Sequence, residues 1–204
     1  MKLYYSATSP YVRKVLIAAI ERGLDDRIER LPTDGFGEEH RPANPLAKVP
    51  ALVPDDGGPA LYDSIVICDH LDRIGDAPRL IPEGGSARDR VLRIHALGQG
   101  MTDAALLLQV QRVRERKSGQ PLPDDWWHER QRQAIHAGAD ALEAEMGALE
   151  GEIDLGQISV ATALGYLDLR FDELQWRQGR EKLAAWYETF AARPSMAATA
   201  PPPA

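Results

Sequence analysis

The chain has 204 residues, of which 44% are hydrophobic and 27% are charged, and its formal net charge is −7. This composition is that of a globular protein with enough apolar side chains for one large domain or two small ones. The negative charge disfavours a surface that follows nucleic-acid phosphates. Apolar runs stay well short of the roughly 18 residues that a membrane-spanning helix needs. We therefore expect a soluble protein that has neither a nucleic acid nor a membrane as partner.

The number and spacing of cysteine and histidine residues exclude further kinds of site. A single cysteine, Cys68, excludes an internal disulfide and a cysteine-based zinc site. Its spacing of three residues from both Ile65 and Leu71 places it on the core face of a helix. The five histidines lack metal-ligand spacing, so we expect no metal. The residues after Met1 show no apolar signal-peptide core, which favours a reducing, cytoplasmic location.

The first 75 residues alternate between strand and helix signals. Apolar residues at three- and four-residue steps predict a helix that begins near Ser9-Pro10 and is ended by Gly23. A second helix is predicted from about 65 to 75. Short apolar or alternating runs predict strands at 2–5, 27–31, 51–53 and 60–62, the last two joined by a Gly- and Pro-rich hairpin turn. This order of elements is that of a thioredoxin-like α/β module.

The rest of the chain is predicted to be helical after a Gly- and Pro-rich linker. Ser86 and Asp89 have the spacing of a capping box, and Ser159 is the expected N-cap of a later helix with Ile158 as its apolar staple. Apolar periodicity predicts helices over 86–118, 126–149, 159–169 and 182–192. Prolines 201–203 form a tail with no expected role in the core. The predicted domains are 1–76, an α/β unit, and 86–204, an all-α bundle.

Three short motifs carry the functional signal. Ser9-Pro10-Tyr11 stands where the first strand turns into the first helix, and Asp63-Ser64 opens the second predicted helix. Between them, Val49-Pro50 runs into a strand, where proline cannot donate to the ladder, and a cis peptide bond is predicted there. In this order and spacing the motifs resemble those of the cytosolic glutathione transferase superfamily, in particular a small bacterial, serine-type member.

The resemblance covers the first 75 residues well, and the helical remainder has the expected length and layout. It implies a thioredoxin-like domain that binds glutathione, an all-α domain that contributes the electrophile pocket, and a homodimer. Ser9 would be the catalytic residue, its hydroxyl donating to the glutathione sulfur. The backbone of Val49, before cis Pro50, would pair with the cysteinyl unit as a short added strand.

The same resemblance assigns the remaining parts of the tripeptide. Asp63 and Ser64 would take the γ-glutamyl end, where a helix N-terminus favours a carboxylate. Lys48 would meet the glycyl carboxylate. Tyr11 is a candidate for the electrophile pocket. The implied reaction is addition of glutathione, as co-substrate, to a small hydrophobic electrophile, without a metal.

Several ordinary interpretations compete with these assignments. Ser9-Pro10 is also a common helix start, with Ser as N-cap and Pro at the first helical position. Tyr4 or Tyr5 is an alternative hydroxyl for the sulfur, and Arg13 is expected on a solvated helix face or else near a ligand carboxylate. At the level of function, the alternatives are a glutathione-dependent thiol-disulfide oxidoreductase and a non-catalytic, glutathione-binding regulatory protein.

Overall fold

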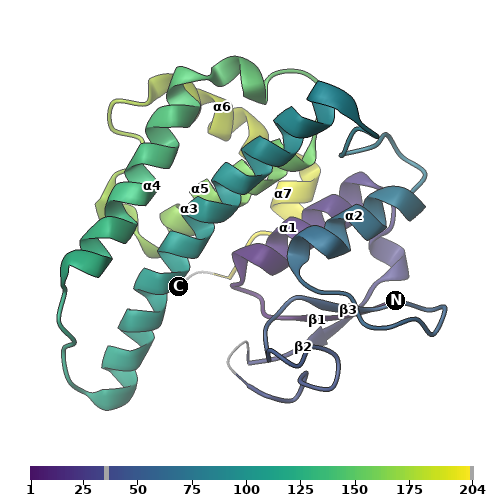
Figure 1. The fold of residues 1–204 in the computed structure, drawn as a ribbon, viewed down its shortest axis with the longest axis horizontal. Coiled ribbons are helices and arrows are strands. Elements are labelled where there is room, and N and C mark those ends of the chain that lie inside the picture. The colour runs from purple at the N-terminus through teal and green to yellow at the C-terminus, as the bar shows by residue number, and fades with distance from the viewer. Residues whose placement is uncertain (35–36, 203–204) are drawn as a thin grey trace.

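The structure, a computed structural model, describes residues 1–34 and 37–202. Figure 1 shows a small sheet with two helices beside a larger group of helices. The strands are β1 (Lys2–Tyr5), β2 (Glu29–Pro32) and β3 (Ala51–Val53). Their order is β2-β1-β3, with β1 parallel to β2 and antiparallel to β3. Helices α1 (Pro10–Glu21) and α2 (Ser64–Ile74) pack against each other over this sheet.

Local signals explain why α1 and α2 begin where they do. The Ser9 side chain accepts a hydrogen bond from the Val12 N–H, and Pro10 occupies the first helical position, where its missing N–H costs nothing. The Asp63 carboxylate caps α2 in the same way by accepting from the Ile65 N–H. Gly23, at φ +69°, ends the α1 segment in the left-handed conformation that glycine adopts readily. Both helix starts confirm the prediction.

One predicted strand does not form. Residues 60–62 make only a single antiparallel bridge, between Leu61 and Leu52. Pro59 has no N–H to extend the ladder on one side, and on the other the chain turns at once into the cap of α2 at Asp63. The hairpin connection itself is present, so the segment still returns alongside β3.

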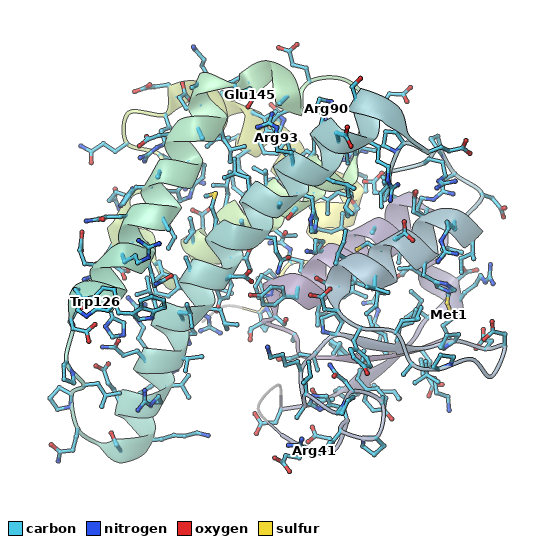
Figure 2. The ribbon with its side chains drawn as sticks, in the orientation of Figure 1. Met1, Arg41, Arg90, Arg93, Trp126 and Glu145 are labelled. Atoms are coloured by element: carbon cyan, nitrogen blue, oxygen red, sulfur yellow. The ribbon has the colours of Figure 1, made fainter. Side chains whose placement is uncertain are left out.

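The remaining helices form the bundle seen in Figure 1. They are α3 (Gly85–Ser118), α4 (Trp126–Ala144), α5 (Leu155–Arg170), α6 (Glu181–Ala191) and α7 (Pro194–Ala198), with short 3-10 turns at Met146–Leu149 and Asp172–Leu174. A third 3-10 turn, Asp25–Arg27, lies between α1 and β2 in the α/β unit. The backbones of α3 and α5 come close at Gly98, where a Cβ would lie 2.7 Å from the Ser159 carbonyl carbon. At one end of the bundle, Arg93 of α3 pairs with Glu145, just after α4 (Figure 2).

One helix cap and two helix boundaries predicted from the sequence are wrong. Helix α3 begins at Gly85 with Gly84 as its cap residue, so Ser86 lies inside the first turn and forms no capping box with Asp89. Helix α5 begins at Leu155, capped by Asp154, whose carboxylate accepts from the Gln157 N–H at 2.9 Å. The helix predicted over 126–149 ends at 144 and gives way to the 3-10 turn.

Ser159 has a different task from the predicted one. Its hydroxyl is buried and donates to the His95 carbonyl oxygen at 3.0 Å, which ties α5 to α3 in the middle of the bundle. Thr162, one turn later, donates to the carbonyl oxygen of Ile158 within α5. Both hydroxyls therefore satisfy buried carbonyl groups rather than a helix end.

A buried ion pair anchors the linker between α2 and α3. Asp72 of α2 is fully buried and lies 3.3 Å from Nε of Arg22, at the end of α1. The same carboxylate accepts from the backbone N–H of Leu80 and Ile81, and from Arg79. These bonds hold the linker against the α/β unit. The predicted domain boundaries, with the α/β unit ending at 76 and the helical unit beginning at 86, stay a prediction.

Buried apolar residues of both units belong to one core. The cluster extends from Leu3 of the sheet, through Val15 of α1 and Ile67 of α2, to Leu164 of α5. Helix α1 contacts both α2 and α5, so the loop that carries Ser9 lies where the two units meet. Among the described residues, no helix is both long and apolar enough to span a membrane.

Candidate functional site

The sheet topology brings the three sequence motifs to one edge. The end of β1 leads to Ser9, and because β3 runs antiparallel to β1, with Tyr4 opposite Ala51, the start of β3 lies at the same edge. Pro50 immediately precedes that start. After β3 the chain turns back and runs antiparallel to it, with Leu61 bridged to Leu52. Asp63, two residues after Leu61, therefore also lies at this edge. Positions far apart in sequence thereby surround one site.

Ser9 is half-buried at the N-terminus of α1. Its Oγ accepts from the Val12 N–H at 3.4 Å, and among the described residues no acceptor takes its hydroxyl proton. A serine that caps a helix with a lone pair keeps its proton for a ligand. The free N–H groups and the dipole of α1 add positive potential at the same place. Capping and a role toward an anion are therefore compatible at Ser9.

The loop before β3 has the shape predicted for it. The Val49-Pro50 peptide bond is cis, as predicted. Pro50 is buried, Val49 is half-buried and Lys48 is exposed. The Asn44 side chain supports the loop by donating to the Lys48 carbonyl oxygen at 2.8 Å. Across the described chain, neither the N–H nor the C=O of Val49 has a backbone partner, so both are available to an extended ligand.

The N-terminus of α2 forms the third side of the site. Asp63 is exposed and accepts from the Ile65 N–H at 3.3 Å, whereas Ser64 is buried at the first helical position. No hydrogen bond involves the Ser64 hydroxyl within the described ranges. The unpaired N–H groups of a first helical turn suit a carboxylate, and the Asp63 carboxylate suits an amine.

A polar network that the sequence did not reveal lies beside this edge. Tyr11 donates to Asp103 of α3 at 2.6 Å, and Gln99 bonds the same carboxylate at 3.0 Å. Gln99 also accepts from Lys14 of α1, whose Nζ lies 3.0 Å from Nε2 of His95. Lys14 is buried, and burial lowers its pKa. The only sequence signal for this network was a lysine on the apolar side of the first helix.

Burial sets the protonation state of two groups near the site. Burial, followed by the bond to Asp103, raises the pKa of Tyr11 far above its ordinary value, so this hydroxyl stays protonated and donates. Burial also raises the pKa of Cys68 to about 12, which keeps the thiol protonated and inert in the core of α2. The prediction that Cys68 is a core residue is confirmed.

A small cleft opens beside Ser9 toward the bundle. Its walls include Arg13 of α1, Thr162 and Tyr166 of α5, and Pro201 of the C-terminal segment, and the cleft is narrow and partly open to solvent. Tyr11 is not among its lining residues. Pro201, which was predicted to lie in a terminal tail, therefore borders the site. Pro203, the last proline of that predicted tail, lies outside the described residues. No group of three or more His, Cys, Asp or Glu in the described parts of the chain is placed to hold a metal.

Comparison with known proteins identifies the family. Residues 8–74 match the family described as "Glutathione S-transferase, N-terminal domain", and residues 124–189 match "Glutathione S-transferase, C-terminal domain". The chain is also 35% identical to the "Uncharacterized GST-like protein YibF" of Escherichia coli K12, over 100% of both chains. The chain belongs to the glutathione S-transferase family.

Solved structures of family members have the same fold. A glutathione transferase family member from Pseudomonas fluorescens Pf-5 is 41% identical with a TM-score of 0.89 over 98% of each chain, and that structure holds glutathione. A second structure of that target, 42% identical with a TM-score of 0.86 over 99% of this chain and 100% of the other, holds S-(propanoic acid)-glutathione. A Methylobacillus flagellatus glutathione S-transferase with bound glutathione is 34% identical, with a TM-score of 0.85 over 98% and 99%. The thioredoxin-like domain followed by a helical domain is thus confirmed.

Proposed function

We propose that this protein is a glutathione transferase that adds the glutathione thiolate to a small hydrophobic electrophile. The convergence of Ser9, the Val49 backbone and the start of α2 at one sheet edge carries this proposal. Relatives that are 34% and 41% identical hold glutathione in their structures, and another structure holds an S-substituted glutathione. Such a thioether is the kind of product that conjugation yields.

Each part of the tripeptide has a partner of matching chemistry at this edge. The cysteinyl unit pairs with the free N–H and C=O of Val49 as a short antiparallel strand. The γ-glutamyl carboxylate binds at Ser64 and the first N–H groups of α2, and the γ-glutamyl amine binds the Asp63 carboxylate. The exposed Lys48 meets the glycyl carboxylate. The thiol then lies at Ser9.

Ser9 makes the sulfur reactive by stabilising its anion. A thiol with a pKa near ~8.5 is only about 3% ionised at pH 7. A hydrogen bond to a charged group contributes roughly 1.5–3 kcal/mol, and a helix N-terminus adds about 0.3–1 kcal/mol. Lowering the thiol pKa by two units needs ~2.7 kcal/mol, which these two contributions supply. Positioning of the electrophile must supply most of the remaining acceleration.

Two other functions are weighed against this one. A thiol-disulfide oxidoreductase needs a reactive cysteine, but the loop carries Ser9, and the thiol of Cys68 is buried with its pKa raised to about 12. A regulatory protein that binds glutathione without catalysis would keep the same tripeptide contacts. Conjugation activity distinguishes it from the transferase.

The assembly that accompanies this function is a homodimer in a reducing cytoplasm. The α/β unit exposes Leu46, Tyr62 and Val66, and the helical unit exposes Leu107 and Trp127. Where exposed apolar side chains lie together in one patch, they mark a contact surface. In the proposed dimer the α/β unit of one subunit packs on the helical unit of the other. A detoxifying role would follow from the hydrophobic electrophile.

Calorimetric titration with glutathione tests the proposal directly. Ser64→Ala is expected to weaken binding roughly 10- to 150-fold, because it removes one hydrogen bond to a charged group. Ser86→Ala is the matched control, since Ser86 is an exposed serine in the first turn of α3. Wild-type protein that fails to bind millimolar glutathione would refute the transferase proposal. Binding without conjugation of any electrophile would favour the regulatory function.

A further inference from the structure

Arg13 lies one helical turn after Ser9, on the side of α1 that faces α5 and α7. One of its Nη atoms donates to the Met196 carbonyl oxygen at 3.1 Å. The guanidinium rests over Gly165 of α5, where a Cβ would lie 2.8 Å from Arg13 Nη1 and 2.7 Å from the Tyr187 hydroxyl. The missing side chain at Gly165 thus makes room for this cation. Arg13 is half-buried, so the expectation of a solvated helix face is wrong.

Arg13 has no counter-ion in the described parts of the chain. Burial lowers its pKa from the ordinary value, and the group that opposes this effect is the Tyr187 hydroxyl, not a carboxylate. Its Nε is enclosed without a hydrogen-bond partner among the residues described. By contrast, the buried arginines Arg22 and Arg180 each pair with an aspartate. A partly desolvated cation without an anion is costly, and a bound anion would offset that cost.

Arg13 lies on a different side of α1 from the polar network described above. Tyr11 and Lys14 bond to Asp103 and Gln99 of α3, whereas Arg13 bonds to Met196 of α7. Arg13 instead lines the cleft beside Ser9, together with Thr162, Tyr166 and Leu169. An anion bound there would belong to the second substrate.

We infer that the electrophile carries a carboxylate next to its reacting carbons and that Arg13 binds this carboxylate in the cleft beside Ser9. The inference rests on the proposed transferase reaction and replaces the purely hydrophobic electrophile by a small α,β-unsaturated carboxylic acid. A guanidinium presents paired N–H donors that match a carboxylate, and it does so more specifically than an ammonium group.

The chemistry also gives Arg13 a reason to be there. The thiolate sulfur forms a bond to the β-carbon, the π electron pair moves to the α-carbon, and that carbon takes a proton from water. The carboxylate is unchanged, and no oxidant or reductant is needed. An unsaturated carboxylate repels an incoming thiolate because both are anions. The guanidinium neutralises this repulsion and fixes the β-carbon near the sulfur.

The test compares two glutathione thioethers that differ only in charge: S-(2-carboxyethyl)glutathione and the corresponding amide. Wild-type protein is expected to bind the acid at least about 10-fold more tightly than the amide, because a charge-assisted pair replaces a neutral contact. Arg13→Gln should abolish this preference and leave affinity for glutathione unchanged. Arg13→Lys should retain part of the preference. Arg30→Gln is the control for net charge, since Arg30 lies on β2 and pairs with Asp25.

The kinetic counterpart is the ratio of kcat/KM for acrylate to that for acrylamide, which should fall in Arg13→Gln. Gly165→Ala crowds the guanidinium without removing its charge and should lower the same ratio. This variant replaces Arg13→Gln in the test if Arg13→Gln does not fold. Equal wild-type affinity for the acid and the amide would overturn the inference and leave the transferase proposal standing. Loss of affinity for glutathione itself in Arg13→Gln would also overturn it. Absence of glutathione binding in the wild type would refute both.

Discussion

The role of Ser9 gives a quantitative prediction. Its Oγ already accepts from the Val12 N–H at 3.4 Å, so the interaction with sulfur must come from the hydroxyl proton. Replacing Ser9 with Ala removes that donor but leaves the N–H groups of α1 and their dipole in place. The lost hydrogen bond of roughly 1.5–3 kcal/mol corresponds to a rise of about one to two units in the pKa of the bound glutathione thiol.

Ultraviolet titration of the thiolate in the complex measures this pKa. Affinity for the neutral thiol should change little, because the proposed binding mode holds the ends of the tripeptide at Lys48 and at the start of α2. Ser9→Thr keeps a hydroxyl and a capping oxygen and should titrate close to the wild type. Loss of the cap in Ser9→Ala should lower the free energy of unfolding by about 0.5–2 kcal/mol, which a urea titration measures separately.

The result that would refute this reasoning is a pair of identical thiolate titration curves for the wild type and Ser9→Ala. Ser9 would then be a helix cap alone. Tyr4 and Tyr5 would be the next hydroxyls to test, through their Phe variants.

Three further predictions concern stability. Burial, followed by the nearby Lys14, lowers the pKa of His95 to about 3, so the unfolded chain binds the extra proton below its own pKa of ~6.5. Unfolding free energy should therefore fall by about 2 kcal/mol between pH 7 and pH 5, and a His95→Gln variant with the same slope would contradict this. Asp72→Ala should cost about 3–5 kcal/mol in urea titrations, because a buried cation loses its partner, whereas Asp69→Ala on the surface should cost under ~1 kcal/mol. Gly98→Ala should destabilise by roughly 1–3 kcal/mol, because its Cβ meets the α5 backbone. Gly100→Ala, on the open side of the same helix, should instead stabilise by up to ~1 kcal/mol, and equal melting temperatures for the two variants would count against this packing.

Much of the candidate site could be predicted because its signals are local. Ser9 and Asp63 act on N–H groups two or three residues away, so their capping depends on short-range geometry that the sequence itself specifies. The Val49-Pro50 bond likewise depends on the dipeptide and its turn. The spans of α1, α2 and α6 follow from apolar periodicity and end signals within the same segments.

Where two local signals compete, packing selects between them. Asp154 and Ser159 both have side chains that can cap a helix, and the sequence analysis predicted Ser159. The cap of α5 lies five residues earlier, at Asp154, because the Ser159 hydroxyl is used in the core, on the His95 carbonyl oxygen of another helix. A cap needs its side chain at a free helix end, and the docking of α5 on α3 decides where that end lies.

The sequence by itself determined most of the elements, the caps of α1 and α2 and the motifs that meet at the sheet edge, since these depend on contacts within a few positions. Only the tertiary structure brought Lys14 to His95, 81 residues away, and Arg13 to Met196, 183 residues away. Neither contact could be predicted from apolar periodicity. Periodicity predicts which face of a helix is buried, but it does not predict which side chains of other helices pack against that face. The surroundings of the Arg13 cation are therefore a property of how α1, α5 and α7 pack together.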